Sequence, residues 1–180
     1  MSVRTRAAVA LAALVVLLFS VPNASAAGGC AAANASASAA TKRALVRATL
    51  CVLNAQRARH QLRPLRLNRR LSRASQRHSR AMAEHRFFSH NSLSGASFVD
   101  RIRSTGYLSG ARSWVVGENI AYGSGSRSTP RSIGTAWMNS APHRANILSS
   151  SYRAIGIGIA SGTPVGRRGG TYTTDFGRRS

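Results

Sequence analysis

Acidic residues are scarce in this sequence. Four Asp and Glu residues stand against 26 Lys and Arg residues, which gives a formal net charge of +22. Lys42 is the only lysine, so arginine supplies almost all of this charge. The excess has two interpretations. It attracts a polyanion such as nucleic acid, anionic lipid or an anionic cell-wall polymer, or it reflects an arginine-rich composition whose side chains are simply solvated.

Aromatic residues and familiar catalytic motifs are also rare or missing. Aromatics make up 6% of the chain, and no stripe of arginine interleaved with aromatics is visible, so we expect no specific nucleic-acid partner. The sequence has no GxSxG elbow, no HExxH zinc pair and no Walker loop, the signals by which several enzyme classes are recognised. Gly156-Ile157-Gly158 begins like a dinucleotide fingerprint. However, Ser161 replaces the third glycine, so we interpret the segment as a strand.

An apolar run near the N-terminus predicts export. It covers residues 7–19 and follows two positive residues, Arg4 and Arg6. Ala24-Ser25-Ala26 then matches the small-x-small pattern that signal peptidase accepts. We predict a removable signal peptide over residues 1–26 and a secreted mature chain without a membrane span. A permanent anchor is disfavoured, because the run is too short to cross about 30 Å of hydrocarbon comfortably.

Both cysteines lie beyond the predicted cleavage point. An even number in an exported chain suggests one disulfide, between Cys30 and Cys51. It would close a loop of about 20 residues and contribute about 3 kcal/mol in the chain-entropy model. The position of Cys30 also leaves a lipoprotein open, although Ala27 stands where a lipobox usually has leucine. Residues 27–40 are rich in Ala, Ser and Gly, which predicts a linker ordered only near Cys30.

Removal of the signal peptide leaves about 150 residues, the size of one domain with a single core. Periodicity and capping residues predict helices over 41–60, over 68–86 with Asn68 as N-cap, over 97–105 with a capping-box start at Ser97, and from Thr129-Pro130 onward. Strands are predicted over 115–122, 155–159 and 171–176, with residues 162–170 as a hairpin loop. Helices mainly precede strands, which predicts an α+β domain whose helices pack on an antiparallel sheet.

Polar residues in apolar segments are the candidate functional groups. Two of the four acids, Glu118 and Asp175, fall in predicted strands. A carboxylate in a partly buried strand needs a hydrogen-bond donor or a cation. A His/Glu cluster that includes His90 and His143 is one way to meet that need. Spacing along the chain does not by itself define such a cluster.

Several motifs follow one another in the order of a known family. They include Phe88-Ser89-His90, Gly117-Glu118-Asn119-Ile120-Ala121, His143-Arg144-Ala145-Asn146-Ile147-Leu148 and Tyr172-Thr173-Thr174-Asp175-Phe176-Gly177. Together they resemble bacterial members of the CAP superfamily, to which cysteine-rich secretory proteins, venom antigens and plant pathogenesis-related proteins belong. The resemblance covers nearly the whole mature chain and identifies a CAP domain over residues 41–180.

The resemblance implies an α-β-α sandwich, in which a central antiparallel sheet lies between helical layers and a cleft opens on one side. Eukaryotic members line this cleft with two histidines and two glutamates, and some bind a divalent metal there. His90 matches the first histidine and Glu118 the first glutamate. Ser140 and Thr171 stand where the second glutamate and second histidine would be, so only half of that set is present.

The candidate cleft residues are therefore His90, Glu118, His143 and Asp175, of which the last two are features of the bacterial branch. His90 and His143 are the candidate metal ligands, because imidazoles beside a carboxylate suit Zn²⁺ or a similar divalent ion. No cofactor is required by this pattern. Without metal, Glu118 and His90 could still act as an acid/base pair.

Each candidate also has a structural interpretation. Glu118 could accept hydrogen bonds from nearby loop amides, and Asp175 could pair with an arginine. His143 would be favourable near the C-terminal end of the preceding helix when protonated. His78 lies on an apolar helix face, which predicts a hydrogen-bonded core histidine. Asn146 is expected to cap a turn.

No nucleophile is visible in these motifs, and a fold does not establish an enzyme. We therefore predict a secreted, monomeric, non-catalytic binding protein whose cleft holds a small ligand or a divalent metal. Two alternatives remain open. One is a metal-assisted hydrolase of peptide or cell-wall substrates. The other is a cationic protein held at the cell surface by an anionic wall polymer.

Overall fold

The computed structural model describes residues 29–180, and the predicted signal peptide, residues 1–26, lies outside them. The described elements are α1 (Lys42–Arg59), β1 (Arg66–Leu67), α2 (Arg69–Glu84), α3 (Phe98–Ser104), β2 (Trp114–Gly123), a short 3₁₀-helix (Gly125–Ser128), α4 (Pro130–Asn139), α5 (Ala141–Leu148), β3 (Ala154–Thr163) and β4 (Gly166–Arg179). Over the described part of the chain, no helix combines the length and hydrophobicity needed to cross a bilayer.

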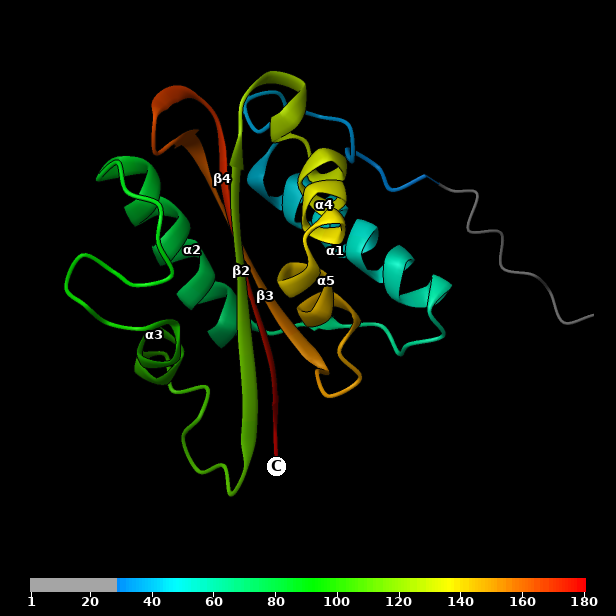
Figure 1. Cartoon of the computed structure of the whole chain (residues 1–180), viewed down its shortest axis with the longest axis vertical. Helices are drawn as coiled ribbons and strands as arrows, with labels where there is room; N and C mark the ends of the chain where they lie inside the picture. Colours follow the sequence, from blue (N-terminus) through cyan, green and yellow to red (C-terminus); the bar gives the residue numbers. More distant parts are fainter. Residues whose placement is uncertain (1–28) are drawn as a thin grey trace, which may run out of the picture.

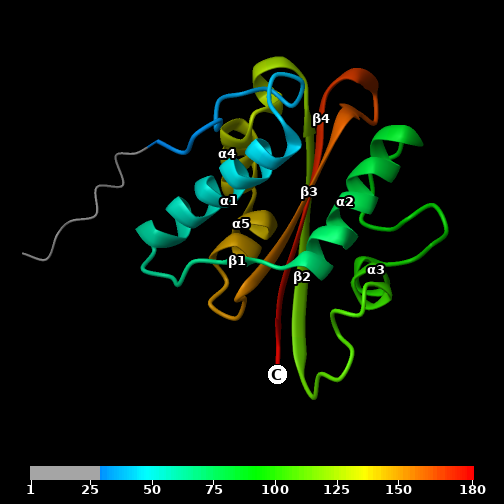
Figure 2. The same ribbon diagram turned by 180° about the vertical axis from the view of Figure 1, so that it is seen from behind.

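Two helical layers enclose one sheet. Helices α1, α4 and α5 lie on one face, and α2 and α3 lie on the other (Figure 1), an arrangement that the view from behind also shows (Figure 2). The strand order is β1-β3-β4-β2, and β4 pairs antiparallel with both β2 and β3. The predicted α-β-α sandwich is confirmed. The two-residue β1, which was not predicted, pairs parallel with β3 and makes the sheet mixed.

The predicted hairpin loop is shorter than expected. Strands β3 and β4 continue through most of residues 162–170, so only Pro164 and Val165 separate them. The helix starts agree with prediction. Asn68 accepts hydrogen bonds from two amides of α2, Ser97 forms a capping box with Asp100, and Thr129 caps α4. These signals lie within three or four residues of one another, which is why the local sequence reveals them.

The main core lies between the sheet and the layer of α1 and α4. Side chains alternate along β3, and its three isoleucines, Ile155, Ile157 and Ile159, are buried in this core. They pack among large apolar residues from the helices and from β4, namely Leu45, Leu53, Ile133, Trp137, Tyr172 and Phe176. The alternation confirms that the glycine-containing motif of this segment is a strand.

The opposite face of β3 carries Gly156 and Gly158, which let α2 approach the sheet closely. A Cβ atom at Gly156 would overlap the backbone of Leu71, and one at Gly158 would overlap the backbone of Ser75. Ser79 fixes the same contact, because its hydroxyl donates to the carbonyl oxygen of Gly158 (3.0 Å). Helix and sheet therefore meet backbone to backbone on this side.

Residues 29–40, the described part of the predicted linker, pack against the domain. Ala33 and Ala37 are buried, and Ala37 belongs to the main core. Arg131 of α4 binds the segment twice, since its amide donates to the carbonyl oxygen of Ala33 (2.9 Å) and its Nε to Oδ1 of Asn34 (2.7 Å). The expectation of order only near Cys30 was too narrow, because small side chains fit closely where composition indicated only low bulk.

The structure contains the predicted Cys30–Cys51 disulfide, which joins this segment to α1. Replacing both cysteines by serine is expected to lower the free energy of unfolding by about 3 kcal/mol, because the unfolded chain gains the freedom that the closed loop removes. Urea denaturation of the oxidised wild type and the double variant measures the loss. A difference of less than about 1 kcal/mol would contradict this prediction and assign the order of residues 29–40 to packing alone.

Candidate functional site

Strand β2 forms one edge of the sheet and lies between the two helical layers (Figure 1). Its outward carbonyl groups are hydrogen-bonded by helices on one side. Asn146 Nδ2 of α5 donates to the carbonyl oxygen of Glu118 (3.1 Å), and Trp137 Nε1 of α4 donates to that of Ile120 (3.1 Å). These bonds fix α4 and α5 beside the strand.

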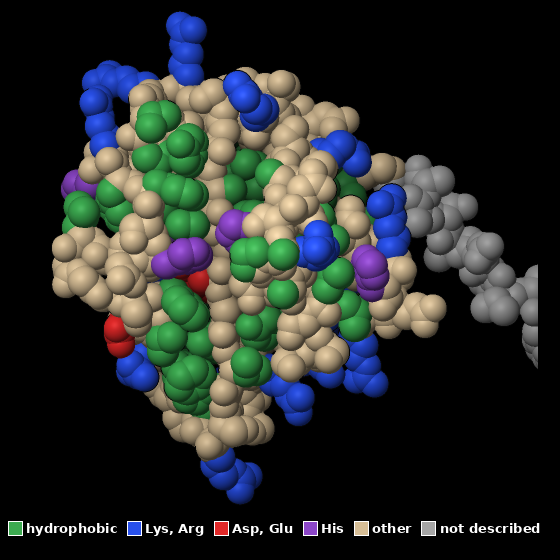
Figure 3. Space-filling view, viewed as in Figure 1, with side chains coloured by type: hydrophobic (Ala, Val, Ile, Leu, Met, Phe, Trp, Pro, Cys, Tyr) green, Lys and Arg blue, Asp and Glu red, His purple; other side chains and the backbone are tan. Residues whose placement is uncertain are grey.

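A cleft of about 460 Å³ lies over this edge. The loop after α2 forms one wall, α4 and α5 form the other, and the middle of β2 forms the floor. The lining side chains are mainly apolar with two histidines: Phe88, Ser89, His90, Ile120, Ala121, Tyr122, Ala136, Trp137, Ser140 and His143. In the space-filling view, histidine side chains lie near the centre of this face beside hydrophobic ones (Figure 3).

Glu118 lies beneath the cleft and holds one wall in place. Its side chain is 1% exposed, Oε1 accepts a hydrogen bond from His90 Nδ1 (2.8 Å), and Oε2 accepts one from Arg101 Nη2 (2.5 Å). Arg101 also donates to the carbonyl oxygen of His90 (2.8 Å). The carboxylate of Glu118 is therefore hydrogen-bonded by both a histidine and a cationic guanidinium group. Since His90 uses Nδ1 for this bond, Nε2 is the ring nitrogen left for a ligand.

His143 reaches the cleft from α5, a helix that was not predicted as a separate element. It lies close to Ser140, the C-cap of α4, but in the first turn of α5, where a protonated ring is unfavourable to the dipole of that helix. Its Nδ1 and the hydroxyl of Ser140 are hydrogen-bonded (2.9 Å). Burial, and secondarily the nearby His90, lowers the pKa of His143. Asn146 is also inside α5, where it binds β2 instead of capping a turn.

Asp175 is brought to Glu118 but does not line the cleft. The two residues are directly opposite in the β2–β4 pairing. The Asp175 side chain is buried, and Ser75 Oγ of α2 donates to its Oδ2 (2.7 Å). Burial, followed by the neighbouring charge of Glu118, raises the pKa of Asp175 well above its usual value. Among the described residues it makes no ion pair with arginine.

His78 is the predicted core histidine. It is buried in α2, and its Nε2 donates to the carbonyl oxygen of Ser89 (2.9 Å). Burial lowers its pKa, which favours the neutral ring. The bond ties α2 to the segment that carries His90, so His78 supports the cleft wall from behind.

The fold agrees with a family comparison. A family model described as the cysteine-rich secretory protein family, CAP, matches residues 50–174. The chain belongs to this family. The motifs that carried the resemblance in the sequence therefore identified the CAP family and its fold correctly.

Relatives of this CAP domain come from several bacteria. YkwD of Bacillus subtilis (strain 168) is 36% identical over 111 residues, which are 61% of this chain and 40% of that protein. An extracellular protein with an SCP domain from Bacillus anthracis str. Ames has a TM-score of 0.59 at 23% identity, covering 76% of this chain and 43% of that one. An outer surface protein of Borrelia burgdorferi has a TM-score of 0.57 at 20% identity, covering 71% and 87%. The chain spans less than half of YkwD.

The donor set of this CAP domain does not fit a metal site with three protein ligands. Within residues 29–180, no three His, Cys, Asp or Glu side chains group closely enough to hold an ion. Both oxygens of Glu118 are already hydrogen-bonded. At the two departures from the eukaryotic pattern, Ser140 binds His143, and buried Thr171 donates to the carbonyl oxygen of Gly162. Two imidazoles remain, one ligand fewer than catalytic zinc sites use.

Sequence reasoning missed two parts of this site. Arg101 was not among the candidate residues, although its guanidinium is the cation that neutralises Glu118. The aromatic rim was also missed. Phe88 and Tyr122 are both partly exposed, and their rings meet edge to face with centroids 4.9 Å apart. In the sequence, the one local sign of these exposed rings was Phe88, an aromatic residue close to His90 in a predicted loop.

Proposed function

We infer that this CAP domain is an extracellular binding protein whose cleft takes a small ligand with an apolar body and a polar end. The observation that carries this inference is the composition of the cleft, where Phe88, Tyr122 and Ala136 provide exposed apolar surface and His90 and His143 provide the polar groups. An apolar hollow with a few placed polar groups is typical of small-molecule sites.

The histidines can hold the polar end of the ligand. His90 is fixed by Glu118 and Arg101, so little conformational freedom is lost when its ring binds. Burial lowers the pKa of His143, which favours its neutral ring. A neutral ring has one N–H group that can donate to a carboxylate, sulfonate or hydroxyl oxygen, and one nitrogen that can accept from a hydroxyl group.

The same geometry supports binding over covalent catalysis. Ser140 and His143 are at nucleophile–base distance. In activated pairs of this kind, a third group orients the base. Among the described residues, no side chain hydrogen-bonds the other ring nitrogen of His143, so this pair lacks that partner.

Binding of 1-anilinonaphthalene-8-sulfonate, which joins aromatic rings to an anionic group, tests the proposal. We expect one saturable site. Ala136→Phe fills the cleft from α4, where the side chain is exposed, and is expected to weaken binding by about tenfold or more, while His143→Ala weakens it by a few-fold. His60→Ala, an exposed histidine outside the cleft, is the matched control. Fluorescence titration that shows equal affinity for all four proteins would refute the cleft as the binding site.

A metal in the cleft is the second form of the proposal, and a metal-assisted hydrolase depends on it. Two imidazoles in one cleft are the feature that favours it. Calorimetric titration of Zn²⁺ into the wild type, His90→Ala and His143→Ala distinguishes the forms. A stoichiometric site lost in both variants would support a metal, and heat no greater than in buffer would exclude both the metal form and the hydrolase.

Export completes the proposed function. The predicted signal peptide, the disulfide and the extracellular or surface descriptions of structural relatives support export. Mass spectrometry of the mature chain from culture medium is expected to find an N-terminus at Ala27. A chain that begins with a lipid-modified Cys30 would instead show a lipoprotein.

A further inference from the structure

Arginines gather around a second hollow, which shares no residue with the cleft. Its volume is about 470 Å³, and it lies where the start of α2 meets the end of β4. Four of its six lining residues are arginines, and all four are exposed: Arg69, Arg70, Arg73 and Arg179. No acidic residue lines it.

Two of these guanidinium groups are held in place by the protein. Arg70 Nη1 donates to the carbonyl oxygen of Gly106 (2.8 Å), and Arg179 Nη1 donates to those of Tyr107 and Ser109 (both 2.8 Å). Neutral carbonyl groups leave the positive charge intact, and the remaining N–H groups stay available. Within the described chain, none of the four arginines pairs with a carboxylate. The hollow is therefore an arrangement of uncompensated and partly preorganised cations.

The charge comes from these side chains and not from a free helix end. The amides of Arg70 and Leu71, in the first turn of α2, already donate to the side chain of Asn68. An anion in the hollow would therefore be bound by guanidinium groups, whose forked donors match phosphate oxygens in pairs.

The hollow continues into a line of arginines along α2. Arg73 also borders a neighbouring hollow of about 260 Å³ together with Arg77 and Arg80. Arg69, Arg73, Arg77 and Arg80 recur every three or four residues, so they share one side of the helix at intervals of about 6 Å. Glu84, 3.9 Å from Arg80, is the acid at the far end. We call these four residues with Arg70 and Arg179 the arginine track.

We propose that the arginine track binds a phosphodiester-linked polyol polymer of the cell envelope, with successive phosphates on successive arginines. Evenly spaced cations suit a chain in which phosphate recurs regularly better than they suit a single anion. One exposed aromatic ring, Trp114, lies opposite Arg179 at the end of the track, and Tyr107, the aromatic residue that lines the hollow itself, is 4% exposed. Along α2, from Arg69 to Arg80, no exposed aromatic ring lines the two hollows, so successive bases would have nothing to stack on there. Single-stranded nucleic-acid sites depend on such stacking, so the polyol polymer is the better match.

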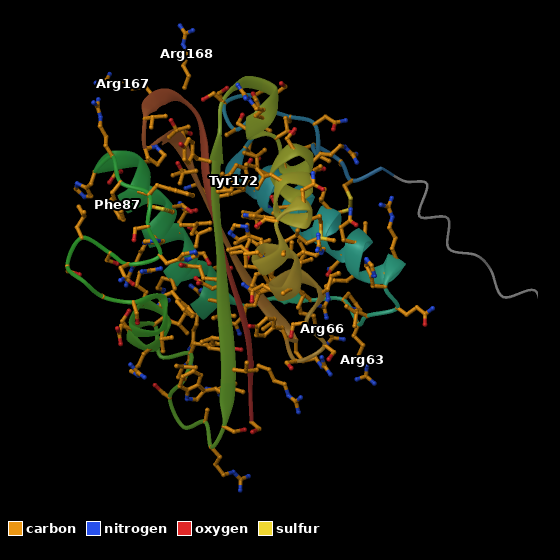
Figure 4. The ribbon with its side chains drawn as sticks, in the orientation of Figure 1. Arg63, Arg66, Phe87, Arg167, Arg168 and Tyr172 are labelled. Atoms are coloured by element: carbon orange, nitrogen blue, oxygen red, sulfur yellow. A yellow bond between two sulfur atoms is a disulfide. The ribbon has the colours of Figure 1, made fainter. Side chains whose placement is uncertain are left out.

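Net charge alone could also attract this polymer, and matched variants separate the two causes. Arg69→Gln with Arg73→Gln removes two charges from the track. Arg167→Gln with Arg168→Gln removes two charges from the start of β4, next to the hairpin turn, where both side chains project away from the domain (Figure 4). The probe is a synthetic octamer of glycerol phosphate, and its binding to the full mature chain is measured by calorimetry at a series of salt concentrations. Thermal denaturation confirms that each variant is folded.

The track variant is expected to weaken octamer binding about tenfold and the hairpin variant less than about twofold, with a shallower salt dependence for the track variant only. Equal losses in both variants would overturn the proposal, because binding would then follow total charge. A single-stranded DNA with the same number of phosphates is the last arm. Binding of that DNA as tight as that of the octamer, with the same loss in the track variant, would assign the track to nucleic acid instead.

Discussion

Gly158→Ala is expected to destabilise the domain by about 3 kcal/mol or more, which is at the upper end of the usual cost of an added methyl group. The new Cβ atom would overlap the backbone of Ser75 in α2, and a backbone cannot rotate away as a side chain can. Relief requires α2 to move off the sheet. Urea denaturation followed by circular dichroism measures the free energy of unfolding.

Gly166→Ala is the matched control for this experiment. At Gly166 the nearest atom to a new Cβ is the hydroxyl oxygen of Thr163 at 3.9 Å, an ordinary contact. The control is expected to be neutral or slightly stabilising, since alanine restricts the unfolded chain more than glycine does. If Gly158→Ala unfolded at the same urea concentration as Gly166→Ala, the close packing of α2 on β3 would not be a determinant of stability.

The second large effect concerns the pH dependence of stability and comes from Asp175. Its pKa is raised in the folded state by burial and by the charge of Glu118. Below the ordinary carboxyl pKa of about 4, the folded and unfolded chains both hold the proton. As pH rises from there toward the folded-state pKa, the unfolded chain ionises first, so stability falls with increasing pH. Each unit by which the pKa is raised costs about 1.4 kcal/mol above that window.

Asp175→Asn should remove this loss. An asparagine amide is uncharged and its oxygen can accept the hydrogen bond from Ser75, as a protonated carboxyl can. We expect the variant to match the wild type near pH 4 and to exceed its unfolding midpoint at pH 8. Denaturation at a series of pH values measures the difference. If the unfolding midpoint of the wild type instead rose relative to that of the variant with increasing pH, Asp175 would be ionised in the folded protein.

Asp100→Asn provides a control of opposite sign. Hydrogen bonds from Ser97 lower the pKa of this exposed capping residue, so its contribution is present at neutral pH and is lost as pH falls. This variant should therefore be less stable than the wild type at pH 8 and approach it in acid. Comparison of the two variants tests whether burial of Asp175, and not the presence of a carboxyl group as such, causes stability to fall with rising pH.

The sequence predicted those parts of the fold that depend on neighbours along the chain. Asn68, Ser97 and Thr129 cap their helices through residues three positions away, so their roles can be read locally. The alternation of isoleucine and glycine likewise revealed β3. Helix α5 was not predicted, because Pro142 and a short apolar pattern resemble a turn. Strand β1 was not predicted, because two residues show no periodicity.

The site was predicted only as a set of residue types. Family motifs named His90 and Glu118, but the roles of Arg101 and Asp175 depend on which side chains the sheet and α3 bring together. Arg57 shows the same limit. An arginine in α1 is expected to be solvated, yet it is fully buried and donates to the carbonyl oxygens of Ile147 (2.6 Å) and Ser149 (2.9 Å) at the end of α5. Its role became visible only with the position of α5.

The hydrogen bonds from Asn146 and Trp137 to β2 also decide how a partner can approach this molecule. An exposed sheet edge is a template on which an extended peptide, or another copy of the chain, can add as a further strand. At Glu118 and Ile120 the carbonyl groups of this edge already accept hydrogen bonds from α5 and α4. A peptide therefore cannot be recognised there through its backbone, and whatever enters the cleft must be selected by the shape and chemistry of its side groups. The same two bonds protect the middle of this edge from the strand-to-strand association that leads to aggregation.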